Sequence, residues 1–311
     1  MTLGAAPSAW LLLVQPLQSL WFDPQGLPSP EAPPARRTVR VVADLIEETH
    51  VTIGVPALMG SDRQGLIQVQ LNSQLPDMPL RTTWQTAASQ PLLPKAFALQ
   101  AMGVASPALQ SALDAELEVQ RPLQGVWSLS YLMAHWAKQR KGLSTAGWLF
   151  LCLSVPYGLR MVLLDDGVPV FSRLLLDTDP RQQATEVGLT LKYLADNRVL
   201  ARFAQVGLVL LQPASGLAEA LEAQGHTVVL RHGGNTDGGV LAEVLALAGP
   251  RAPGQLASNT QRRYFLARQA RQGLTWGGGL LVLGGLVAVA VQGQAVMARL
   301  NQTQQAQQLA I

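Results

Sequence analysis

The chain has 311 residues, of which 48% are hydrophobic and only 14% are charged, and its formal net charge is +3. Because soluble domains carry about 25% charged residues, this composition argues against a protein that is water-soluble throughout. The small positive charge comes from arginines that precede an apolar run, so it gives no reason to expect a nucleic-acid partner. With one cysteine, Cys152, the chain cannot form an intrachain disulfide, which fits a reducing compartment.

We predict that residues 1–37 form a Pro-rich N-terminal extension, because five prolines fall between residues 24 and 34. The earlier apolar run at residues 9–14 is too short for the core of a signal peptide, and no basic residue precedes it. This end of the chain therefore does not contradict a cytoplasmic location for the residues that follow.

Residues 38–145 are predicted to hold the first half of an α/β domain. Its first strand is rich in valine and is expected to pair with the strand that follows. The run Ser61-Asp-Arg-Gln64 is a capping box that opens a helix, and two later segments have helical spacing. The expected strands are 38–48, 50–55 and short ones within 80–104, and the expected helices are 61–75, 107–120 and 128–141.

Residues 146–250 are predicted to hold the second half. Asp165-Asp166-Gly167 joins two strands as a tight hairpin, since glycine adopts the positive φ that such a turn requires. Asp179 and Pro180 then begin a helix as its N-cap and first residue. Because the later strands alternate with helices, the sheet should be partly parallel. The expected strands are 148–155, 160–164, 168–175, 205–211 and 226–231, and two further helices are expected at 216–224 and 239–248.

A family resemblance rests on a strand, a hairpin that ends in Phe-Ser-Arg at residues 171–173, and a helix that carries Glu186 and Tyr193. These segments resemble the second half of actin-like proteins from the assembly platforms of bacterial pili and secretion systems. The families are the M protein of type IV pili, the L protein of type II secretion and the I protein of the mannose-sensitive haemagglutinin pilus. The resemblance implies an actin-like fold (ASKHA class, with RNase H-like halves) over residues 38–250, followed by a single transmembrane helix.

Actin-like proteins are often ATPases, and the resemblance implies an Asp-x-Gly pattern in the first hairpin of each half, where backbone N–H groups hold phosphates. In the first half the expected segment is Asp44-Leu-Ile-Glu-Glu48, which has no glycine. In the second half it is Ser154-Val-Pro-Tyr-Gly158, where aspartate is absent and proline removes a donor. We therefore expect neither a catalytic residue nor a bound cofactor, and no enzyme activity.

Two other groups of residues could carry chemistry. The polar, Gly-rich loop at residues 231–237 follows a strand, where it could bind a ligand or peptide, or could simply connect that strand to a helix. Asp165 and Asp166 are adjacent carboxylates that a turn explains. Four histidines show no metal-ligand spacing, so no metal site is expected: His50, His135, His226 and His232.

Residues 274–295 are predicted to form a transmembrane helix that follows a basic juxtamembrane linker at 251–273. The first 18 residues of this run carry no charge, and about 20 apolar residues suffice for a helix to cross the hydrocarbon core. Glycines in the run would weaken a soluble helix, but in a membrane they let another helix approach closely. Gly277, Leu281 and Gly284 lie on one side and form the expected packing face.

Four arginines decide the expected orientation: Arg262, Arg263, Arg268 and Arg271. They precede the apolar run, whereas only Arg299 follows it, and positive residues stay on the cytoplasmic side. We therefore expect a single-pass protein of the bacterial inner membrane, with the N-terminal bulk in the cytoplasm. Residues 296–311 should form a helical tail in the periplasm.

The expected function is that of a non-enzymatic scaffold in the assembly platform of a type IV pilus or type II secretion system. The resemblance implies that it links a motor ATPase, or another cytoplasmic platform protein, to single-pass platform subunits of the N, O or M type. Membrane lipid and a second copy of the chain are further expected partners, and nucleic acid is not. Two alternatives remain open: an active actin-like ATPase, and a membrane-anchored regulatory protein unrelated to pili.

The orientation can be tested with a reporter that is active only after export. Fused after Ile311, the reporter should be active, because the basic flank holds the N-terminal bulk in the cytoplasm. Replacement of all four flanking arginines by glutamine should weaken this orientation bias. A reporter that stays inactive on the unmodified chain would contradict the prediction.

Overall fold

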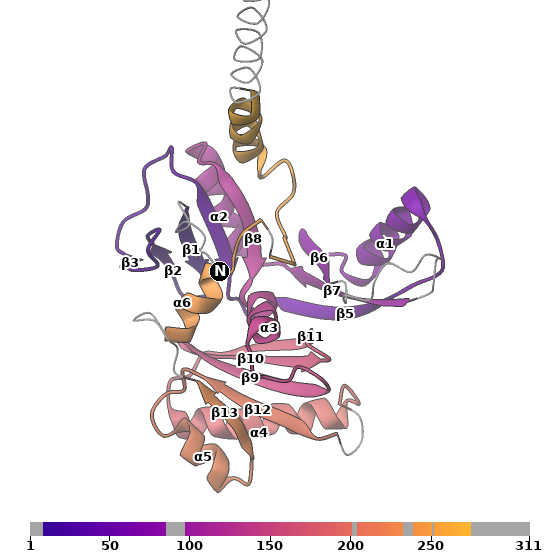
Figure 1. Cartoon of the computed structure of the whole chain (residues 1–311), viewed down its shortest axis with the longest axis vertical. Helices are drawn as coiled ribbons and strands as arrows, with labels where there is room; N and C mark the ends of the chain where they lie inside the picture. Colours follow the sequence, from indigo (N-terminus) through magenta and orange to yellow (C-terminus); the bar gives the residue numbers. More distant parts are fainter. Residues whose placement is uncertain (1–8, 85–96, 201–203, 233–238, 251, 275–311) are drawn as a thin grey trace, which may run out of the picture. The chain divides into compact units, whose positions relative to one another are not determined.

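The chain divides into two units, Met1–Arg262 and Arg263–Ile311. Two five-stranded sheets with the same strand order form the framework of the first unit (Figure 1). The computed structural model describes residues 9–84, 97–200, 204–232, 239–250 and 252–274. If the strands of each five-stranded sheet are numbered one to five along the chain, both sheets have the order 3-2-1-4-5. The first half contains in addition a smaller, inserted sheet, which this numbering leaves out. The first three strands pair antiparallel and the others parallel.

The first sheet has the order β3-β2-β1-β4-β8. Its strands are β1 (Trp10–Val14), β2 (Ser19–Phe22), β3 (Pro28–Ser29), β4 (Val39–Ala43) and β8 (Leu123–Ser128). The parallel pair β1 and β4 is buried along almost its whole length, with Leu12 opposite Val41. Strands that are covered on both faces need such continuous apolar runs, which explains the sequence of this pair.

The predicted N-terminal extension at residues 1–37 is therefore wrong, because this region supplies three of the five strands of the first sheet. The prolines that led to the prediction lie where a missing N–H group does not disturb the sheet. Pro28 lies in the short edge strand β3, and Pro24, Pro30, Pro33 and Pro34 lie in connections between strands.

A three-stranded antiparallel sheet with the order β5-β7-β6 is inserted in the first half. It consists of β5 (Glu48–Val55), β6 (Leu80–Trp84) and β7 (Phe97–Val104), and it packs against α1 (Gly60–Gln74). The strand predicted at 38–48 instead ends at Ala43 and does not pair with the next strand, because the chain leaves the first sheet at Asp44. Ser61 is not the cap of α1, since Met59 occupies that position.

The second half has the predicted order of strands and helices, in a sheet of order β11-β10-β9-β12-β13. The elements are β9 (Trp148–Val155), β10 (Gly158–Asp165), β11 (Val168–Leu175), α4 (Pro180–Asp196), β12 (Val206–Leu211), α5 (Leu217–Ala223) and β13 (Val228–His232). Asp166 and Gly167 both have positive φ, as a tight hairpin requires. The carboxylate of Asp179 accepts the N–H of Arg181 at 3.3 Å and caps α4.

The largest core is shared by the two five-stranded sheets and three helices, α2 (Pro107–Glu118), α3 (Leu129–Gln139) and α6 (Gly239–Ala246). α3 is buried on nearly every face, because it lies between the sheets of the two halves (Figure 1). Leu13 of β1, Leu132 of α3 and Leu151 of β9 all belong to this core. The opposite face of the second sheet packs against α4 and α5 in a core of its own.

The segment 252–262, predicted as part of a linker, is packed along the edge strand β8. The N–H of Leu256 donates to the carbonyl of Val126 at 2.8 Å, and the N–H of Val126 donates to Oε1 of Gln255 at 2.8 Å. Gly125 is required there, since a Cβ at that position would overlap the Gln255 side chain. The end of the first unit is thus attached to its first sheet rather than extended as a free tether.

Residues 263–274 are helical in the second unit. Within the stretches that the structure describes, no helix combines the length and the apolar character needed to span a membrane. The predicted span at 274–295 lies outside the described residues except for Leu274, and so do its packing residues Gly277, Leu281 and Gly284. The tail at 296–311 also lies outside them.

Candidate functional site

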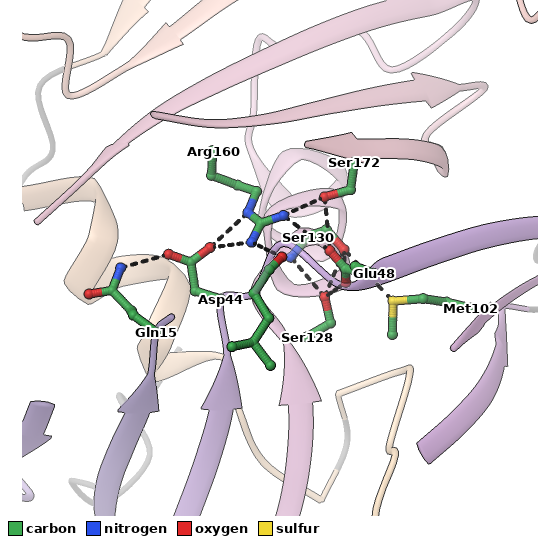
Figure 2. A network of polar contacts seen from close by, with 9 residues as sticks. Gln15, Asp44, Glu48, Met102, Ser128, Ser130, Arg160 and Ser172 are labelled. Atoms are coloured by element: carbon green, nitrogen blue, oxygen red, sulfur yellow. Dashed lines mark hydrogen bonds and ion pairs between the residues drawn. The ribbon is translucent and has the colours of Figure 1, made fainter. Parts of the chain in front are cut away.

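The two halves meet at a buried cluster of charged and hydroxyl side chains, which Figure 2 shows. We call this cluster the charge network; its members are Gln15, Asp44, Glu48, Ser128, Ser130, Arg160 and Ser172. Arg160 and Ser172 come from β10 and β11 of the second half, and the others come from the first half. Most members lie at or beside the end of a strand or the start of a helix, whereas Ser172 lies within β11.

The guanidinium of Arg160 is the centre of the charge network. Its Nε and Nη2 lie 2.7 and 2.6 Å from Oδ1 of Asp44, and its Nη1 lies 3.3 Å from Oε2 of Glu48. Nη1 also donates to Oγ of Ser172 at 2.9 Å, and Nη2 donates to the carbonyl of Leu45 at 2.8 Å. These contacts engage all three nitrogens of the guanidinium, which can donate through five N–H groups.

The two carboxylates accept further hydrogen bonds. Oδ2 of Asp44 accepts Nε2 of Gln15 at 2.8 Å, and Oε1 of Glu48 accepts the hydroxyls of Ser130, at 2.7 Å, and Ser128. Burial alone would raise the pKa of Glu48, but the positive charge of Arg160 and these hydroxyl groups bring it below its usual value. Glu48 is therefore a carboxylate in the folded protein, in spite of its burial.

The network is shielded from solvent, since Asp44 is 0% and Arg160 is 1% exposed. A soluble ligand has no access to these atoms in this conformation. Asp44 and Arg160 are 116 positions apart in the chain and belong to different halves. Their ion pair can therefore hold the two halves together.

The charge network lies between the two hairpins that the resemblance associates with phosphates. The first hairpin joins β1 and β2 through residues 15–18, Gln-Pro-Leu-Gln, so the prediction that placed it at residues 44–48 is wrong. The second hairpin joins β9 and β10 through Pro156 and Tyr157, within the predicted segment 154–158. Gln15 starts the first turn and Arg160 follows the second, and the single carboxylate of Asp44 bridges them.

The four predicted orientation residues all lie in the described part of the chain. Arg262 donates through Nε to the carbonyl of Gln124 at 2.9 Å, and so helps to attach residues 252–262 to β8. Arg263, Arg268 and Arg271 are exposed on the helix at 263–274.

The other candidate residues have structural partners. Arg231 pairs with Glu219 and Glu222 on the surface of α5, whereas residues 233–238 of the same loop lie outside the described residues. The carboxylate of Asp166 accepts the N–H of Gly147 at 2.7 Å, as a turn residue does. Across the described residues, no group of three or more His, Cys, Asp or Glu side chains could hold a metal ion. Burial raises the pKa of Cys152 and disfavours its reactive thiolate.

The sequence interpretation missed the charge network, although one signal pointed to it. Arg160 interrupts an otherwise apolar strand, and a charged residue in a buried strand needs a partner. Asp44 likewise follows a fully buried strand directly. The pairing of these two residues could not be read from their positions, because nothing local links them.

The sequence matches no family model and none of the curated proteins. Among solved structures it is similar to a chain of the PilM-PilN type IV pilus biogenesis complex, with a TM-score of 0.54, 12% identity and coverage of 78% of this chain and 98% of that one. This similarity shows a shared fold, and it agrees with the resemblance to assembly-platform proteins that the sequence predicted.

Two further solved structures are similar at lower scores. One is a protein with an actin-like ATPase fold and unknown function from Bacteroides thetaiotaomicron, with a TM-score of 0.41, 8% identity and coverage of 77% of this chain and 96% of that one. The other is the cytoplasmic domain of EpsL, an inner membrane component of the type II secretion system of Vibrio cholerae. Its TM-score is 0.40 and its identity 11%, and the match covers 70% of this chain and 95% of that one.

Replacement of Arg160 by methionine should lower the free energy of unfolding by about 3–5 kcal/mol, because it leaves two buried carboxylates without their cation. Urea denaturation followed by tryptophan fluorescence measures this change. Arg173→Met is the matched control on the adjacent strand, since its ion pair with Glu186 is partly exposed and should contribute no more than about 1 kcal/mol. An equal decrease in the free energy of unfolding of the two variants would contradict the conclusion that the charge network stabilises the fold.

Proposed function

We propose that this chain is a non-enzymatic scaffold of the assembly platform of a type IV pilus or type II secretion system. One observation carries the proposal: the charge network fills the boundary between the two hairpins, where an actin-like enzyme would hold its nucleotide. The fold shared with a chain of the PilM-PilN complex supports the same class of role. A protein of this fold that performs no chemistry must act by binding.

The composition of the two turns supports the absence of ATPase activity. Pro16 and Pro156 each remove a backbone N–H group from a turn that would otherwise offer it to a phosphate. Neither turn contains the Asp-x-Gly pattern. Gln15 and Arg160 are moreover engaged with Asp44, so phosphate binding would have to break a buried ion pair.

The proposed location is the bacterial inner membrane, with a single span at 274–295 and the N-terminal bulk in the cytoplasm. The uncharged run of the sequence and the arginines before it support this location. Arg263, Arg268 and Arg271 are exposed on the helix that leads toward the run, where they could interact with anionic lipid.

The proposed partners follow from this topology. On the cytoplasmic side, the domain would bind a motor ATPase or another platform protein. In the membrane, the face made by Gly277, Leu281 and Gly284 would bind another single-pass subunit or a second copy of the chain.

Nucleotide binding provides the first test of this proposal. A fragment of residues 1–270 should show no thermal shift with Mg-ATP. A ligand at 100 times its dissociation constant would stabilise the fragment by about 2.7 kcal/mol, which is readily detected. A clear upward shift would favour the ATPase alternative over the scaffold.

Crosslinking in membranes tests the partners. Gly277→Ile together with Gly284→Ile should reduce crosslinking to a neighbouring single-pass helix, because the larger side chains prevent close approach while the span stays apolar. Leu281→Ile is the matched control, since it changes the same face without adding volume. The cytoplasmic domain should also co-purify with an assembly ATPase when residues after Val291 are removed. Recovery of no platform protein would favour the alternative of a membrane-anchored regulatory protein.

A further inference from the structure

A groove in the first unit, lined by none of the charge-network residues, contains a buried arginine that has no acidic partner among the described residues. The groove has a volume of about 730 Å³, which is within the range of about 300–1,000 Å³ that small-molecule sites usually have. It lies between β1, the loop at 23–27 after β2, the end of α3, and α6. Its larger apolar wall residues are Leu11, Phe22, Leu27, Trp136, Leu245 and Leu247.

Arg40 of β4 lines this groove and is only 5% exposed. Its Nη1 donates to the carbonyl of Ala248 and its Nη2 to the carbonyl of Ala9 at 3.5 Å, whereas its Nε has no hydrogen-bond partner among the residues that the structure describes. Both acceptors are neutral backbone groups, and no carboxylate of the described residues forms an ion pair with this guanidinium. Desolvation accordingly lowers the pKa of Arg40. A cation buried in this way is normally paired with an anion.

The two carboxylates that line the groove are already engaged elsewhere. Oδ1 of Asp23 accepts the N–H groups of Gln25 and Leu27, both at 2.9 Å, and so holds the loop after β2. Glu243 accepts Nε1 of Trp136 at 3.1 Å and lies 3.5 Å from Nη1 of Arg140. Neither wall carboxylate therefore forms an ion pair with Arg40, which keeps only neutral acceptors among the described residues.

We propose that the groove binds a small carboxylate carried on an apolar body, with the carboxylate at Arg40 and the apolar part along the walls. The planar guanidinium presents N–H groups in the geometry that suits a carboxylate. A doubly charged phosphate would need a second cation, and Arg140 at the edge of the groove is paired with Glu243. The mainly apolar walls fit an aryl or alkyl group. The scaffold role does not require this site, and the site does not require the scaffold role.

Calorimetric titration of the full chain in lipid nanodiscs tests the proposal, with empty nanodiscs as the blank. The probes are 4-phenylbutyrate and 4-phenylbutanol, which share an apolar body and differ in the charged group. The carboxylate should bind at least tenfold more tightly than the alcohol. Equal affinity for the two probes, or no binding of the carboxylate, would overturn the proposal.

Three variants locate the binding site. Arg40→Met should remove the preference for the carboxylate. Ala246→Phe, at an exposed position of α6 on the groove wall, should block both probes without disturbing the core, and it keeps the test decisive if Arg40→Met does not fold. Arg181→Met changes an exposed arginine on α4 and should bind like the unmodified chain. Carboxylate binding that persists unchanged in Ala246→Phe would place the site elsewhere and contradict the proposal.

Discussion

The guanidinium of Arg160 lies between the carboxylates of Asp44 and Glu48, and the arrangement of the first unit depends on this contact. The arginine belongs to the second half and both carboxylates belong to the first. Burial of three charged groups is unfavourable unless each is paired and hydrogen-bonded. Because these partners come together only when both halves are folded, the network favours one relative position of the halves over others.

The same network also determines where a helix begins. Ser128 is the N-cap of α3 and accepts the N–H of Ser130, while both hydroxyls donate to Glu48. The local capping bond between Ser128 and Ser130 is thus combined with long-range hydrogen bonds from both hydroxyls to Glu48. The helix that starts there is buried between the sheets and carries much of the shared core, so the charge network and the apolar packing stabilise the same boundary.

The strand order is repeated in the two halves of the actin-like architecture. Both sheets have the same topology, but the turns after β1 and β9 contain proline and lack Asp-x-Gly. The shared apolar core and the charge network hold the two sheets together. The composition of the two turns supports the scaffold that we propose. The proposed groove beside Arg40 is lined by elements of both halves, including β1 and α6, and by none of the charge-network residues, so the binding capacity that we propose there is independent of that network.

Elements with local signals could be predicted from the amino-acid sequence. The hairpin at Asp166 and Gly167 and the start of α4 at Asp179 follow from turn and capping chemistry within a few residues, and the structure has both. Three features became visible only in the folded chain: the residues before position 38 form strands, residues 252–262 attach to β8, and Arg160 contacts Asp44. These contacts join positions far apart in the chain. No local preference of a residue encodes such a partner, since it is selected by burial and charge pairing in the folded state.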